Sequence, residues 1–135
     1  MQDVVVQEPY TGDVPVHKFI LLVEDSEMLA HLLVATITHK TTYLIEHVVD
    51  GRSALEVVKH IQPDLLVLDY QLPDMNGLDL YEQIQHSSYY EAIPTIFAST
   101  GFPETVSLNM NTLHLAKPFS MQQFLDAVHL LLDYN

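Results

Sequence analysis

The 135-residue chain contains no cysteine. Disulfides, thiolate metal sites and cysteine nucleophiles are all excluded, so any chemistry must use oxygen, nitrogen or a bound ion. Basic residues are scarce too, because five Lys and Arg stand against 18 Asp and Glu, for a formal net charge of -13. Nucleic-acid binding depends on clustered Lys and Arg, so direct binding of DNA or RNA is nearly excluded, and anionic membrane surfaces are disfavoured for the same reason.

Long apolar runs are absent as well. No run approaches the roughly 18 residues of a membrane span, and residues 1–16 carry neither the basic start nor the apolar core of a signal peptide. We therefore expect a cytoplasmic location and no membrane insertion. Hydrophobic residues make up 48% of the chain, which suits one folded domain, assigned to residues 17–135. Residues 1–16, with two prolines and one glycine, are expected to form a flexible N-terminal extension.

Short, continuous apolar runs alternate along the chain with stretches of helical spacing. Continuous rather than alternating hydrophobicity is typical of strands that are buried on both faces of a parallel sheet. Alternation of such strands with helices predicts an α/β fold with a doubly wound parallel sheet and helices on both faces. The predicted strands are 19–23, 43–49, 65–68, 95–98 and 113–115. The predicted helices begin after Ser26, after Gly51, at Gly77 and near Ser120. The second of these helices is expected to include Ile61 near its end.

Polar residues follow four of these strands, at the edge of the sheet where doubly wound proteins bind their ligands. They are Glu24 and Asp25, Asp69, Ser99 and Lys117. Each residue alone has a structural reading, such as a helix cap or a turn. Three converging carboxylates repel one another, however, and a multivalent cation or protonation must offset them. Ligands that are all oxygen favour a hard cation, and a site with few protein ligands that keeps its waters favours Mg²⁺ over Ca²⁺, with Mn²⁺ as the alternative metal. The lysine and the hydroxyl suit a phosphoryl group.

Three stretches give the chain a resemblance to a known family. Residues 63–77 read PDLLVLDYQLPDMNG, residues 94–100 read PTIFAST and residues 117–119 read KPF. Over about 18–133 the sequence resembles the receiver domains of two-component response regulators. The resemblance implies a flavodoxin-like five-stranded sheet of order 2-1-3-4-5 with about five helices. It also implies a signalling domain that catalyses only its own phosphorylation and dephosphorylation.

The resemblance assigns a role to each acidic residue. Asp69 would be the nucleophile that accepts a phosphoryl group from a histidine kinase or a histidine phosphotransfer protein. Asp25 and Asp69 would bind Mg²⁺ through their carboxylates, and the backbone carbonyl of Gln71 would be a third protein ligand. Glu24 would act mostly through a metal-bound water.

The other two polar residues complete this implied site. Lys117 would offset the charge on Asp69 and later hold a phosphoryl oxygen, while Ser99 would donate its hydroxyl to another phosphoryl oxygen. Phosphorylation adds about -1.5 to -2 charge, which would draw Ser99 and its loop toward Asp69 and change a surface that an unknown downstream protein or effector domain reads.

The chain departs from the family pattern between Ser99 and Lys117. These residues lie 18 positions apart, about one helical turn less than the usual spacing, and 109–112 replace a segment that normally contains glycine. We therefore expect the fourth helix to be short or distorted. His114 stands where an aromatic switch residue is usual, and we interpret it as a partly buried strand residue. The alternative hypothesis is that its imidazole makes the switch sensitive to pH.

Three other functions compete with this interpretation. A flavodoxin-type FMN carrier would need a phosphate loop where Glu24 and Asp25 stand. A phosphatase with an aspartyl intermediate would need a second carboxylate where Gln71 stands. A degenerate receiver-like scaffold that binds proteins without phosphorylation is the strongest rival, although such members lose acidic residues or the lysine that are all present here. Whether the chain stands alone or comes from a larger protein stays open.

Overall fold

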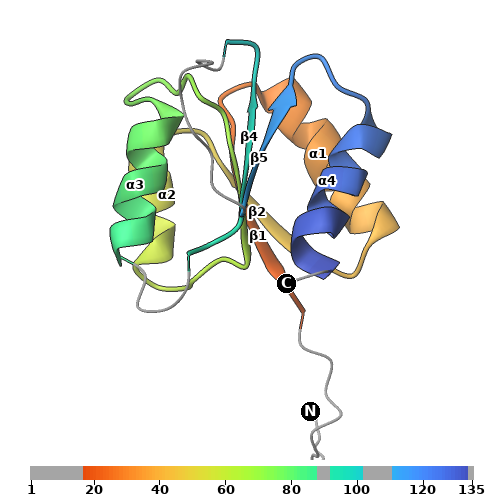
Figure 1. The fold of residues 1–135 in the computed structure, drawn as a ribbon, viewed down its shortest axis with the longest axis horizontal. Coiled ribbons are helices and arrows are strands. Elements are labelled where there is room, and N and C mark those ends of the chain that lie inside the picture. Colours follow the sequence, from red (N-terminus) through yellow and green to blue (C-terminus); the bar gives the residue numbers. More distant parts are fainter. Residues whose placement is uncertain (1–16, 88–91, 102–110, 134–135) are drawn as a thin grey trace, which may run out of the picture.

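A computed structural model describes residues 17–87, 92–101 and 111–133 (Figure 1). Strands and helices alternate along the chain as the apolar pattern predicts, except that β5 directly follows β4 in the order of described elements. In chain order they are β1 Phe19–Val23, α1 Glu27–Lys40, β2 Leu44–Val48, α2 Gly51–Val58, β3 Leu65–Leu68, α3 Gly77–Ser87, β4 Thr95–Ser99, β5 Thr112–Ala116 and α4 Met121–Asp133.

The five strands form one parallel sheet of order β2-β1-β3-β4-β5. Helices α1 and α4 cover one face, and α2 and α3 cover the other (Figure 1). The predicted doubly wound, flavodoxin-like fold with strand order 2-1-3-4-5 is therefore confirmed. In such a sheet the carboxyl ends of neighbouring strands meet at one edge, so residues distant in sequence are brought together there.

The central strands are mainly apolar because the sheet has a hydrophobic core on each face; the exceptions, Thr95 and Ser99, lie at the two ends of β4. In β1, Ile20 and Leu22 pack under α1 and α4, whereas Leu21 and Val23 pack under α2 and α3. All four residues are almost completely buried, as are the four residues of β3 and the five of β4. Successive side chains of a strand point to opposite faces, so two-sided burial requires a continuous apolar run. The rigid centre fixes the residues that follow β1, β3 and β4.

The predicted extent of the second helix is wrong at its end. Helix α2 ends at Val58, and Ile61, which the helical spacing included, is 50% exposed. The amides of His60 and Ile61 both donate to the carbonyl of Val57, which closes the helix in a turn. A residue before a proline is disfavoured in helical conformation, so the chain must leave the helix ahead of Pro63.

Two further predictions lie outside the described residues: the flexible extension over 1–16 and the short or distorted fourth helix, placed on 104–110. Within the described ranges the structure has four helices, which agrees with the predicted fold but not with a full count of five. No helix in this part of the chain is long and apolar enough to cross a membrane.

Candidate functional site

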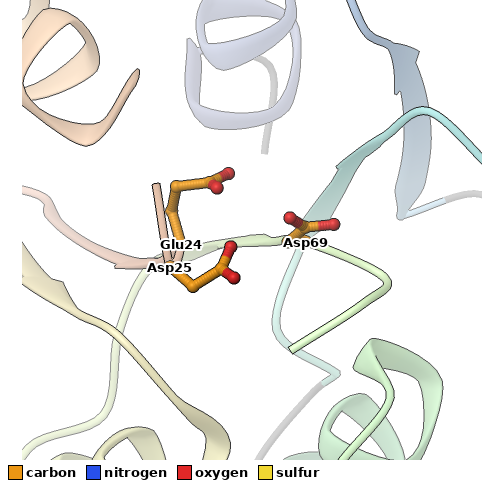
Figure 2. A group of neighbouring side chains, drawn as sticks. All are labelled: Glu24, Asp25 and Asp69. Carbon is orange, nitrogen blue, oxygen red and sulfur yellow. The ribbon is translucent and has the colours of Figure 1, made fainter. Parts of the chain in front are cut away.

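Three carboxylates meet where β1 and β3 end. The two strands are parallel neighbours with Val23 opposite Leu68, so Glu24 and Asp25 emerge beside Asp69. One carboxylate oxygen from each of the three acids lies within 4.8 Å of the others, and Figure 2 shows the side chains of Glu24 and Asp25 extending toward Asp69. Glu24 is 1% exposed and Asp69 is 8% exposed, whereas Asp25 is open to solvent. The predicted acidic cluster is formed.

Lys117 joins this cluster from the end of β5. Its Nζ donates a hydrogen bond to Oε1 of Glu24 at 2.9 Å and to Oδ2 of Asp69 at 3.1 Å. The predicted pairing with Asp69 is present, and the equal pairing with Glu24 was not foreseen. This bond joins residues that follow β1 and β5, two strands that β3 and β4 separate in the sheet. One lysine thus holds two buried carboxylates.

Burial and charge oppose each other in this ion network. Burial raises the pKa of Glu24 above its ordinary value of 4.5, and the hydrogen bond from Lys117 offsets this only in part. Burial lowers the pKa of Lys117, but the hydrogen bonds and charges of Glu24 and Asp69 outweigh it, so the net pKa is raised. Lys117 therefore stays charged at neutral pH, while ionisation of the Glu24 carboxylate carries a desolvation penalty.

The raised pKa of Glu24 predicts a pH-dependent effect of Glu24→Gln on stability. As pH rises from 4.5 through the folded-state pKa, the unfolded chain releases this proton before the folded protein does, so the wild type loses stability over that interval. Glutamine has no such proton. We therefore expect the unfolding free energy of Glu24→Gln, taken relative to that of the wild type, to increase with pH across this interval. Below the interval the difference between the two proteins should not change with pH. Urea unfolding from pH 4 to 8 measures both free energies. If the unfolding free energy of Glu24→Gln instead decreased relative to that of the wild type as pH rises, the predicted direction of the effect would be wrong.

Ser99 ends β4, the strand next to β3, and is 2% exposed. Its carbonyl accepts a hydrogen bond from the amide of Lys117. Its hydroxyl oxygen is the one buried side-chain polar atom without a hydrogen-bond partner among the described residues. A buried hydroxyl without a partner costs about 1–3 kcal/mol, so this position is suited to a ligand oxygen that arrives at the sheet edge.

The loop after Asp69 folds back against the strand end. The amide of Gln71 donates to Oδ1 of Asp69 at 3.1 Å, and Gln71 forms an isolated antiparallel bridge with Asn76. Gly77 then passes so close that an added Cβ would lie 2.3 Å from the backbone oxygen of Asp69. Glycine is therefore required for close packing at this position, whereas the ligand role of the Gln71 carbonyl stays a prediction.

Two residues that support the site were not found by sequence analysis. The carboxylate of Asp74 accepts from the amides of Gly51 and Arg52, both at 2.9 Å; these bonds cap α2 and lower the pKa of Asp74. His47, on β2, forms a 2.7 Å hydrogen bond through Nε2 to the backbone oxygen of Glu24. Both contacts join residues more than 20 positions apart, and no local pattern signals them.

The predicted partial burial of His114 is wrong. His114 lies on β5 opposite Phe97 and is exposed. Its neighbours Leu113 and Leu115 point into the core under α1 and α4, so alternation turns His114 to the other face. β5 is an edge strand, and His114 does not belong to the hydrophobic cluster that the described residues form on that face. The role of His114 in switching stays a prediction.

Comparison with known proteins identifies relatives of this arrangement. The family model for the response regulator receiver domain matches residues 20–129. A protein-glutamate methylesterase/protein-glutamine glutaminase 3 of Paramagnetospirillum magneticum is 32% identical over 81 residues, which are 59% of this chain and 22% of that protein. The polar-differentiation response regulator DivK of Brucella anthropi is 26% identical over 115 residues, which are 82% of this chain and 93% of DivK.

A solved structure shares the fold. A CheY-like response regulator receiver domain protein from Methanospirillum hungatei superposes with a TM-score of 0.79 at 21% sequence identity, over 88% of this chain and 96% of that one. Except for Phe19, the family model covers every residue of the five strands, and it covers all of the acidic cluster together with Ser99 and Lys117. The chain therefore belongs to the response regulator receiver domain family.

Proposed function

We propose that this domain accepts a phosphoryl group on Asp69 from a histidine kinase or a histidine phosphotransfer protein, in a reaction that depends on Mg²⁺, and that phosphorylation switches a protein-interaction surface. One observation carries the proposal: Asp69 is buried in a cluster of three carboxylates and bonded to Lys117 at 3.1 Å. Phosphoryl transfer requires mainly positioning and charge neutralisation, and this arrangement supplies both.

The three carboxylates suit a magnesium ion, because oxygen ligands are the ones that this ion prefers. Both oxygens of Glu24 already accept hydrogen bonds, from Lys117 at 2.9 Å and from the amide of Ser26 at 3.1 Å. Both oxygens of Asp69 also accept hydrogen bonds, from Lys117 and from the amide of Gln71, so these bonds do not separate the two acids. The proposed role of Glu24, through a metal-bound water, is the one that the family resemblance implies. Asp25 and Asp69, with the carbonyl of Gln71, are the proposed direct ligands. Bound Mg²⁺, or Mn²⁺ in its place, would neutralise charge on the phosphoryl oxygens.

The reaction takes place at one carboxylate oxygen of Asp69. As this oxygen forms a bond to phosphorus, the bond between phosphorus and the donor histidine nitrogen breaks, and the imidazole leaves. Lys117, already beside Asp69, is placed to hold a phosphoryl oxygen. The hydroxyl of Ser99, buried and without a partner among the described residues, can donate to another.

The output of this switch is a change of surface. The phosphoryl group brings about -1.5 to -2 charge and strong acceptor oxygens, so Ser99 is expected to form a hydrogen bond that it lacks before phosphorylation. A two-state equilibrium then shifts toward the form that contains this bond. The partner that binds the changed surface is proposed to be a downstream protein or an effector domain. The proposed location is the cytoplasm, and this domain is proposed to make no direct contact with nucleic acid.

Chemical phosphorylation tests the proposal. Incubated with acetyl phosphate and Mg²⁺, the wild-type chain is expected to gain the mass of one phosphoryl group in intact-protein mass spectrometry, and EDTA is expected to prevent the gain. Beryllofluoride with Mg²⁺ should shift the amide resonances around Ser99. A chain that shows neither the mass gain nor the spectral change would be a degenerate receiver, and the proposal would be wrong.

A further inference from the structure

The backbone oxygen of Glu24 lies just beyond the end of β1 and is bonded to a side chain. The amide of Glu24 continues the parallel ladder and donates to the carbonyl of Val48 at 3.1 Å. In a regular parallel ladder the next donor to Glu24 would be the amide of Asp50. Here the chain turns at Asp50 to start α2, and Nε2 of His47 forms the bond at 2.7 Å. The imidazole takes the place of a ladder amide.

We propose that His47 is a positioning residue for the metal site, acting through the peptide bond that joins Glu24 to Asp25. The carbonyl of Glu24 and the amide of Asp25 belong to one planar unit, so a hydrogen bond to the carbonyl restricts rotation of the whole plane. The direction in which the Asp25 side chain leaves the backbone is thereby restricted as well. The inference rests on the proposed binding of Mg²⁺ by this cluster.

Asp25 depends on its backbone more than the other two acids do. The side chain of Glu24 is held by Lys117 and Ser26, and that of Asp69 by Lys117 and Gln71. The carboxylate of Asp25 is exposed and accepts no hydrogen bond from the described part of the chain. Without side-chain partners, its position before metal binding is set by the peptide unit that His47 holds.

The surroundings of His47 keep its ring in place. The residue is half-buried on the face that α1 covers, in a hollow between α1 and β2 whose other lining residues are Glu27, Ala30, His31, Val34 and Val49. A carbonyl oxygen only accepts hydrogen bonds, so Nε2 must carry the proton of the neutral ring. His31 lines the same hollow and forms no hydrogen bond with the described residues, which makes it a matched control.

Magnesium affinity of the full chain tests this role. Titration with MgCl₂, followed by amide resonances in proton–nitrogen spectra, gives the Kd of the wild type, His47→Leu, His47→Gln and His31→Leu. We expect His47→Leu to raise the Kd about tenfold, as is typical when support for a metal ligand is lost. His47→Gln, which keeps a terminal N–H donor, should restore most of the affinity, and His31→Leu should match the wild type.

The outcomes separate this inference from the proposed function. A wild-type Kd in folded His47→Leu, or an equal loss in His31→Leu, would overturn the role of His47 and leave the metal site intact. A wild type that binds no Mg²⁺ would overturn the proposed function itself. If His47→Leu does not fold, His47→Asn replaces it, because its amide is too short to reach the carbonyl. The tautomer of the His47 ring gives a further check. A neutral ring that carries its proton on Nδ1 has no proton on Nε2 to donate, which would exclude the hydrogen bond to Glu24.

Discussion

The Asp69→Asn variant is expected to gain no phosphoryl group from acetyl phosphate in the presence of Mg²⁺. An amide oxygen is a poor nucleophile, and the amide also removes one negative charge from the group that holds the metal. Labelling should therefore fall to background, while the variant keeps its fold, because asparagine matches aspartate in size and leaves fewer like charges at the sheet edge. Intact-protein mass spectrometry of equal incubations measures the difference.

A control variant shows that the loss is specific. Asp79 lies exposed in the first turn of α3 and is not part of the acidic cluster, and Asp79→Asn changes the net charge by the same amount. It should be labelled as fully as the wild type. Labelling of Asp69→Asn at the wild-type level would show that another residue accepts the phosphoryl group and would reject the assignment of Asp69.

The Lys117→Met variant is expected to lose about 3 kcal/mol of unfolding free energy in the absence of divalent metal at neutral pH, since removing one partner leaves buried charge uncompensated. In the part of the chain that the structure describes, Lys117 is the one cation that pairs with both Glu24 and Asp69, whose side chains are only 2% and 10% exposed. The pKa of Glu24 is already raised by burial, and losing the lysine raises it further. Urea unfolding in EDTA measures the loss.

Magnesium and a surface lysine provide the comparisons for this variant. Mg²⁺ should stabilise Lys117→Met more than it stabilises the wild type, because the ion supplies the positive charge that the variant lacks. Lys59 pairs with Glu56 on the surface, where both side chains are more than 60% exposed, so Lys59→Met should change stability by less than about 0.5 kcal/mol. Equal effects of the two substitutions would contradict the idea that the buried network depends on Lys117.

Most of the fold could be predicted because its physical causes are local in sequence. The centre of the sheet requires strands that are apolar on both faces, and β1, β3 and β4 show this as continuous apolar runs. Predictions were weaker where a residue lies at an edge. Ile61 continues a helical pattern beyond the end of α2, and His114 is an exposed residue of β5, an edge strand. At such places burial depends on neighbours that the pattern does not identify.

The site could be predicted in its members but not in all of its contacts. Asp69, the acidic pair, Ser99 and Lys117 each follow a strand, and the carboxyl ends of parallel strands must meet at one edge. The hydrogen bond from Lys117 to Glu24 does not follow from this strand arrangement and could not be predicted from it. It joins residues that follow β1 and β5, which are not neighbours in the sheet, so it depends on side-chain positions that only the packed sheet edge sets.

The sequence by itself determined the parallel sheet, the set of residues at its carboxyl edge and the family, because the apolar runs and the residues that follow them are properties of short segments. Only the tertiary structure decided how those residues are held. His47 bonds to the carbonyl of Glu24 because β2 ends its ladder beside β1, and Asp74 caps α2 because the loop after Asp69 folds back onto it. These contacts join segments that become neighbours only when the sheet forms, so their geometry exists in the folded chain and not in any stretch of sequence.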